Sequence, residues 1–128
     1  MSAPVLVLSL PNDVRSPERA RRAIESWLAG YGAPAGSVAN AVAVVNELVT
    51  NGVLHASGVI DLRAEVEGDA LFIEVATAPA APDEARVARP EPSESGRGFT
   101  IVGACCDVVD IRDDPSGFRH VICTIALR

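Results

Sequence analysis

The chain contains no lysine, and all 11 of its basic residues are arginines. This absence excludes a phosphate-binding loop built around a lysine, so any cationic side chain that contacts a phosphate must be an arginine. Acidic residues outnumber basic ones, and the formal net charge is −6. Because a nucleic-acid-binding surface requires a basic patch, we expect no direct contact with nucleic acid.

Long apolar runs and a cysteine framework are also missing. No run approaches the roughly 20 apolar residues that a membrane span needs. The apolar N-terminal stretch lacks a basic flank, so no signal peptide is predicted. Adjacent Cys105 and Cys106 and the distant Cys123 match neither a zinc-site spacing nor a set of disulfides. We interpret the cysteines as small buried hydrophobic residues and expect a cytoplasmic protein without membrane association.

The remaining composition is that of one globular domain, residues 1–128, with 48% hydrophobic residues. A first strand is expected at Pro4–Leu10. The next helix begins with Ser16 as its N-cap and ends at Gly30 or Gly32. A second helix, which we expect Ser37 to cap, runs to about residue 56.

Strict alternation of apolar and polar residues then predicts a hairpin of two strands, residues 59–67 and 71–75. Each strand places its apolar side chains on one face, which we expect to face the core. These side chains are Ile60, Leu62, Ala64, Val66, Leu71, Ile73 and Val75.

The segment Ala76–Ser95 contains four prolines and few large apolar residues, so it predicts a long loop that acts as a lid. A short helix is expected within residues 96–107. Two strands, residues 108–113 and 118–127, follow and are joined by the turn Asp114–Gly117. Hairpins with helices between them predict an α+β fold: a two-layer sandwich whose mixed, mostly antiparallel sheet is covered by helices on one face.

The segment NELVTNGVLHAS, residues 46–57, places Glu47, Asn51 and His55 four residues apart. On a helix this spacing aligns the three side chains along one stripe, beside the apolar face. The solvated edge of an ordinary helix shows the same pattern. The stripe alone therefore does not define a site.

The segment SGRGF raises a similar question. Glycines ahead of a helix let backbone N–H groups approach an anion, and Arg97 adds a charge-assisted hydrogen bond to a phosphate. An ordinary turn that enters a helix after a loop also contains such glycines. This segment alone is as ambiguous as the polar stripe.

In combination, the polar helix edge, the hairpin, the proline-rich loop and the Gly-x-Gly helix entry follow one another in a set order. That order resembles the histidine-kinase-like ATPase (GHKL) family, which has the Bergerat-type ATP-binding fold. The small size resembles the anti-sigma-factor serine/threonine kinases of Gram-positive bacteria. NELVTNGVLHA resembles the family's N-box and GRGFTIVGACCD its G2 box, and the resemblance covers nearly the whole chain.

The resemblance implies ATP and Mg²⁺ as cofactors, and a sigma factor and an anti-sigma-factor antagonist as protein partners. It gives Glu47 the role of general base toward a serine hydroxyl, and it makes Asn51 an oxygen ligand of Mg²⁺. It assigns His55 no chemical role. Homodimerisation through the strand Pro4–Leu10 is left open. The segment implied to close over the nucleotide phosphates comprises Gly96, Arg97, Gly98 and Phe99.

The chain departs from the family at the G1 box, where an aspartate reads the adenine amino group and a glycine follows two residues later. Thr77 stands at the aspartate position, and no glycine follows. Threonine accepts a hydrogen bond less strongly than a carboxylate, and losing a charged partner typically costs about 1.5–3 kcal/mol. Near the C-terminus, Arg119 and His120 stand where the family tends to have a small Gly-Lys/Thr turn.

Two functions from different classes follow. The first is a regulatory serine/threonine kinase that binds a sigma factor and phosphorylates an anti-sigma antagonist. The second is a partner-switching binding module that keeps the fold and has lost efficient ATP binding and kinase activity. The N-box residues favour the first function, and the altered G1 box favours the second.

Overall fold

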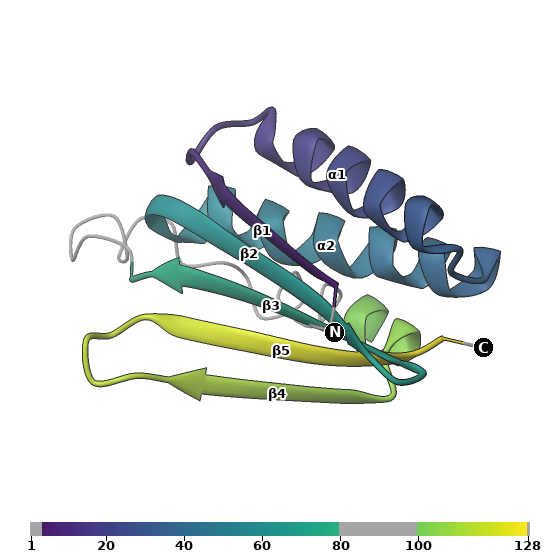
Figure 1. Ribbon diagram of the computed structural model, residues 1–128. Helices are drawn as coiled ribbons and strands as arrows, with labels where there is room; N and C mark the ends of the chain where they lie inside the picture. Colours follow the sequence, from purple (N-terminus) through teal and green to yellow (C-terminus); the bar gives the residue numbers. More distant parts are fainter. Residues whose placement is uncertain (1–3, 80–99, 128) are drawn as a thin grey trace.

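The computed structural model describes residues 4–79 and 100–127. These residues form a curved sheet with helices packed against one of its faces (Figure 1). Residues 100–105 form a further short helix. In chain order the other elements are β1 (Val5–Leu10), α1 (Ser16–Tyr31), α2 (Ala35–His55), β2 (Ser57–Glu67), β3 (Ala70–Ala78), β4 (Val108–Asp113) and β5 (Arg119–Ala126).

The sheet has the strand order β1-β2-β3-β5-β4. Every pairing among the described strands is antiparallel, where the sequence predicted some parallel pairing as well. The connection explains this difference. The chain crosses from β1 to β2 through two helices that run in opposite directions, so β2 returns antiparallel beside β1 (Figure 1). The predicted α+β sandwich with helices on one face is confirmed.

The predicted apolar faces form the core between the helices and the sheet. On α1, Ala20, Ile24 and Leu28 are fully buried and recur every fourth residue. The inward side chains predicted for β2 and β3 are all buried as well. Across the sheet β5 adds Val121 and Ile125. The buried residues of α2 are Ser37, Ala41, Val44, Val45, Leu48, Val49 and Gly52.

Among the described residues, α2 is also long and apolar enough to cross a membrane, judged by length and composition alone. In this fold α2 packs against α1 and against β2, β3 and β5. Its apolar residues therefore have partners within the domain.

The starts of the two helices differ from the prediction. α1 begins at Ser16 and α2 already at Ala35, and neither N-cap side chain makes a capping hydrogen bond. The Ser16 hydroxyl donates to the carbonyl of Pro11 over 2.6 Å, and the Ser37 hydroxyl donates to the carbonyl of Ala126 over 2.9 Å. Both serines are buried and bind the helices to neighbouring chain segments instead of capping them.

The cysteine interpretation is right for Cys123, which is fully buried on β5. Cys105 and Cys106 are only half-buried. A hydrogen bond with Cys123, followed by burial, raises the pKa of the Cys106 thiol. A thiol held neutral in this way is a poor nucleophile, which agrees with a structural role.

β3 continues through Ala78, so residues 76–78 of the predicted lid belong to the sheet. They pair with β2 on one side, and Ala76 and Thr77 pair with β5 on the other. Residues 80–99 lie outside the described part of the chain. The expectations for the remainder of the lid therefore stay predictions.

A charged cluster lies on the sheet face that the helices leave uncovered. The His120 ring makes one hydrogen bond to Glu74 through Nδ1 and one to Asp114 through Nε2, both 2.9 Å long. The two carboxylates raise the pKa of His120, Asp114 more than Glu74. Hydrogen bonds from Ser116, and then from His120, lower the pKa of Asp114 to about 2. A neutral imidazole donates only one hydrogen bond, so satisfying both carboxylates requires the charged ring.

This cluster predicts a pH-dependent contribution to stability. Because the pKa of His120 is raised on folding, the contribution is complete below the unfolded value of about 6.5 and is lost as pH rises through the folded value. We expect the unfolding free energies of wild type and His120→Gln to differ most in mild acid and to converge as pH rises. Urea titrations across that range measure the difference, and a constant difference would contradict the assignment.

Candidate functional site

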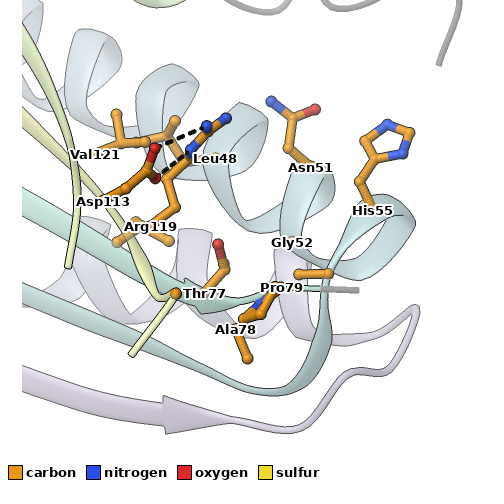
Figure 2. Close-up of a pocket in the computed structure, with 13 residues that line it drawn as sticks. Leu48, Asn51, Gly52, His55, Thr77, Ala78, Pro79, Asp113, Arg119 and Val121 are labelled. Atoms are coloured by element: carbon orange, nitrogen blue, oxygen red, sulfur yellow. Dashed lines mark hydrogen bonds and ion pairs between the residues drawn. The ribbon is translucent and has the colours of Figure 1, made fainter. Parts of the chain in front are cut away.

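A cavity of about 610 Å³ lies between α2, the end of β3 and the β4–β5 hairpin. Leu48, Val75 and Val121 give it apolar walls. Figure 2 shows Asp113 and Arg119 on one side of the cavity and Asn51 and His55 on the other. Its volume falls within the range of about 300–1,000 Å³ typical of small-molecule sites, and an apolar pocket with a few polar groups is the usual form of such sites. The polar side chains in its lining are Asn51, His55, Thr77, Asp113 and Arg119.

Gly52 allows α2 to approach the sheet closely beneath this cavity. A Cβ at this position would lie 2.9 Å from Cδ1 of Ile60 and 3.1 Å from Cγ2 of Thr77, so these side chains would have to move to admit it. The end of α2 is held from outside by Asn12, whose Nδ2 donates to the carbonyls of Gly52 (3.2 Å) and Ala56 (3.1 Å). The carbonyl of Gly52 also accepts from the backbone N–H of Ala56 over 3.0 Å, so Asn12 adds a second hydrogen bond there. These hydrogen bonds fix the helical turn that presents Asn51 and His55.

Of the three polar residues predicted to lie along one stripe of α2, Asn51 and His55 line the cavity and Glu47 does not. Asn51 lines the cavity, and its carboxamide makes no hydrogen bond within residues 4–79 and 100–127, so it is available to a ligand. Glu47 lies one turn earlier on the same helix, half-buried and outside the cavity lining. It has no ion pair or hydrogen bond among the described residues. Its predicted role as a base stays a prediction.

His55 ends α2 and also lines the cavity. Its Nδ1 atom is buried and has no hydrogen-bond partner among the described residues. A buried nitrogen without a partner costs free energy that a ligand can recover. The sequence assigned no role to His55, and the structure places it in the same cavity as Asn51.

Thr77, Arg119 and Asp113 form a row across three neighbouring strands. Thr77 on β3 pairs directly with Arg119 on β5, which in turn pairs with Asp113 at the end of β4. All three line the cavity. Arg119 donates from Nε to Oδ1 of Asp113 over 2.9 Å and from Nη2 to Oδ2 over 3.2 Å (Figure 2). The guanidinium holds the pKa of the Asp113 carboxyl below its ordinary value, so the pair is charged at neutral pH.

Thr77, predicted to contact a nucleotide base, lines the cavity, and its role toward a base stays a prediction. Asp113 was missed, and Arg119 was noted only as a departure from the family pattern. No signal in the local sequence marks these two residues, because the pairing of β3, β5 and β4 brings them beside Thr77.

The cavity is compatible with Mg²⁺ bound together with a phosphate ligand. The described residues contain no cluster of three His, Cys, Asp or Glu side chains suited to a metal ion. Mg²⁺ needs no such cluster, because it commonly keeps waters and uses one or two protein oxygens plus substrate phosphates. The free carboxamide of Asn51 supplies an oxygen of this kind. The donor set therefore fits a nucleotide-bound Mg²⁺ rather than a metal held by the protein alone.

The predicted phosphate-closing residues Gly96, Arg97, Gly98 and Phe99 lie outside the described residues. The described chain resumes at Thr100 in the predicted short helix, and Val102 of that helix is fully buried in the core. The helix that was expected after the glycines is thus confirmed, whereas the role of the glycines stays a prediction.

A protein-family model matches most of the chain. Residues 10–123 match the model of the histidine kinase-like ATPase domain. The chain belongs to this family. The predicted family is thereby confirmed over almost the whole chain. No curated protein sequence gives a significant match.

Two solved structures show the same fold. The chain resembles the structure of the RsbU and RsbW domains of Rv1364c from Mycobacterium tuberculosis, with a TM-score of 0.76 and 22% identity. The similarity covers 97% of this chain and 32% of that one, so this chain spans about a third of its length. The SiaB-SiaC complex from Pseudomonas aeruginosa gives a TM-score of 0.68 at 14% identity, covering 94% of this chain and 89% of that one. At these identities the likeness concerns the fold.

Proposed function

We propose that this ATPase-family domain is a regulatory serine/threonine kinase that binds a nucleoside triphosphate with Mg²⁺ in the cavity between α2 and β3. The observation that supports this function most is Asn51. Its carboxamide lines the cavity without a hydrogen-bond partner among the described residues. Its position on the wall of a cavity distinguishes Asn51 from an asparagine on an ordinary solvated helix edge.

Each residue at the proposed site has a separate role. Asn51 would hold Mg²⁺, which when bound neutralises charge on the phosphates. The apolar side chains of Leu48, Val75 and Val121 would exclude water from around the nucleotide base. Glu47, one turn before Asn51, would accept the proton of the attacking hydroxyl of a protein substrate. No lysine is present to take part.

We further propose a sigma factor and an anti-sigma antagonist as the partners, in the cytoplasm. The small size, which resembles the anti-sigma-factor kinases, supports these partners, and one of the similar structures is that of the SiaB-SiaC complex. β1 is an edge of the sheet and exposes Val5 and Val7 at 42% and 65%. This apolar edge supports the proposal of a homodimer formed through β1.

One observation favours the second function, a binding module without kinase activity. The residue at the base-reading end of β3 is Thr77, so the carboxylate that binds adenine in the family is replaced by a hydroxyl. Loss of such a partner lowers the affinity for ATP by roughly tenfold to a hundredfold. The fold and its partner surfaces do not depend on that contact.

Calorimetric titration separates the two functions. We expect ATP and GTP to bind only weakly without Mg²⁺ and measurably with it, because Asn51 contributes through the metal. A protein that binds its partner tightly yet binds neither nucleotide at millimolar concentration is the module and not the kinase.

A further inference from the structure

Thr77, the proposed base-binding residue, lies next to Arg119, which forms an ion pair with Asp113. Thr77 and Arg119 are paired residues on adjacent antiparallel strands, and both line the cavity. Side chains in this relation have Cβ atoms about 4.5–5.5 Å apart. Both side chains therefore contribute to the same part of the cavity lining.

Asp113 decides how that guanidinium is presented. Nε and one N–H of Nη2 are used by the two carboxylate oxygens of Asp113. At the end of the guanidinium, two parallel N–H donors remain, one on Nη1 and one on Nη2. Asp113 thus acts as a positioning residue for Arg119.

This arrangement is unfavourable for adenine. The amino group of adenine is a donor and needs an acceptor, whereas Arg119 offers only donors. Asp113 is the one carboxylate in the lining formed by the described residues, and both of its oxygens already accept from Arg119. The hydroxyl of Thr77 is the one side-chain acceptor in this row that is not already held in an ion pair.

We propose that the cavity prefers a purine with an oxygen at position 6, as in guanine and hypoxanthine, over adenine. The inference rests on the proposed nucleotide binding and names its base. The two free donors of Arg119 match the O6 and N7 acceptors of such a purine, which is the geometry by which arginine recognises guanine in nucleic acids. The hydroxyl of Thr77 adds a donor or an acceptor at the same edge.

The test is calorimetric titration of the wild-type chain with GTP, ITP and ATP in the presence of Mg²⁺. GTP and ITP share O6 and N7, so both are expected to bind at least about tenfold more tightly than ATP. ITP lacks the 2-amino group of GTP. A preference for GTP alone, with ITP no tighter than ATP, would place recognition elsewhere and overturn the proposal.

Arg119→Gln is the decisive variant. This substitution removes the guanidinium donors and leaves Asp113 free to accept from the adenine amino group. The preference for GTP over ATP is therefore expected to disappear or reverse. Arg112→Gln is the matched control. Arg112 forms a similar ion pair with Asp110 on β4, is exposed and lies outside the cavity lining, so its loss should leave the preference unchanged. Thermal unfolding checks that both variants remain folded.

The outcomes distinguish the base preference from the proposed function. If the wild-type protein binds ATP at least as tightly as GTP, the proposed base preference is wrong. The proposal of nucleotide binding then still stands. An equal loss of GTP and ATP affinity in Arg119→Gln means that the arginine holds phosphates, and it also overturns the preference. Absence of binding by all three triphosphates overturns both.

Discussion

Replacing Asn51 with alanine is expected to reduce Mg²⁺-dependent nucleotide binding by about a hundredfold or more. Changes to residues that merely orient metal ligands typically cost about 10–100-fold in metal affinity, and loss of a direct ligand costs at least as much. Asn51 is the lining residue whose carboxamide has no competing hydrogen bond among the described residues. Titration with nucleotide and Mg²⁺ measures the effect, and titration in excess chelator gives the reference without metal.

Asn40→Ala provides a matched control for this substitution. Asn40 is an exposed asparagine on the same helix and lies outside the cavity lining, so its replacement tests the general effect of losing a carboxamide from α2. We expect wild-type binding from this variant. If Asn51→Ala binds Mg²⁺ and nucleotide like wild type, the assignment of Asn51 as the metal ligand is wrong.

Replacing Glu47 with glutamine is expected to slow phosphoryl transfer to the protein substrate by about 10²–10⁴-fold, the usual contribution of a general base. Glutamine keeps the size of the side chain and removes its ability to accept a proton. Glu47 has no partner among the described residues, so the exchange breaks no described contact. Nucleotide affinity should stay close to that of wild type, because a general base acts on the hydroxyl and not on the nucleotide.

Single-turnover transfer to the purified antagonist measures this effect, with Glu25→Gln as the control. Glu25 is an exposed glutamate on α1, far from the cavity lining, and its exchange should not change the rate. Equal loss of nucleotide affinity and rate in Glu47→Gln would indicate a binding role instead of a catalytic one. A wild-type protein that binds nucleotide but transfers no phosphate would identify the binding module.

The two substitutions probe neighbouring turns of one helix that the sheet holds closely. Gly52 lies close to the side chains of Ile60 on β2 and Thr77 on β3. A side chain at Gly52 would displace them, and Thr77 lines the cavity, so a substitution there cannot separate metal binding from the shape of the cavity. Asn51 and Glu47 are better targets because their side chains make no described contact that supports the fold.

The sequence by itself determined the elements and most of the core. Alternation along β2 and β3 predicted which side chains are buried, because successive residues of a strand point to opposite faces whatever the strand pairs with. The four-residue spacing of Asn51 and His55 likewise predicted that both lie on one side of α2, and both line the cavity. These are short-range properties of the backbone, so they can be read from neighbouring residues.

Contacts between distant segments were decided only by the tertiary structure. Ser37 has the sequence signature of a cap, yet its buried hydroxyl donates to the carbonyl of Ala126 at the other end of the chain. Nothing close to Thr77 in the chain predicts Arg119 beside it. That pairing arises because β5 inserts between β3 and β4, and the register of the strands then fixes which side chains meet at the end of the cavity.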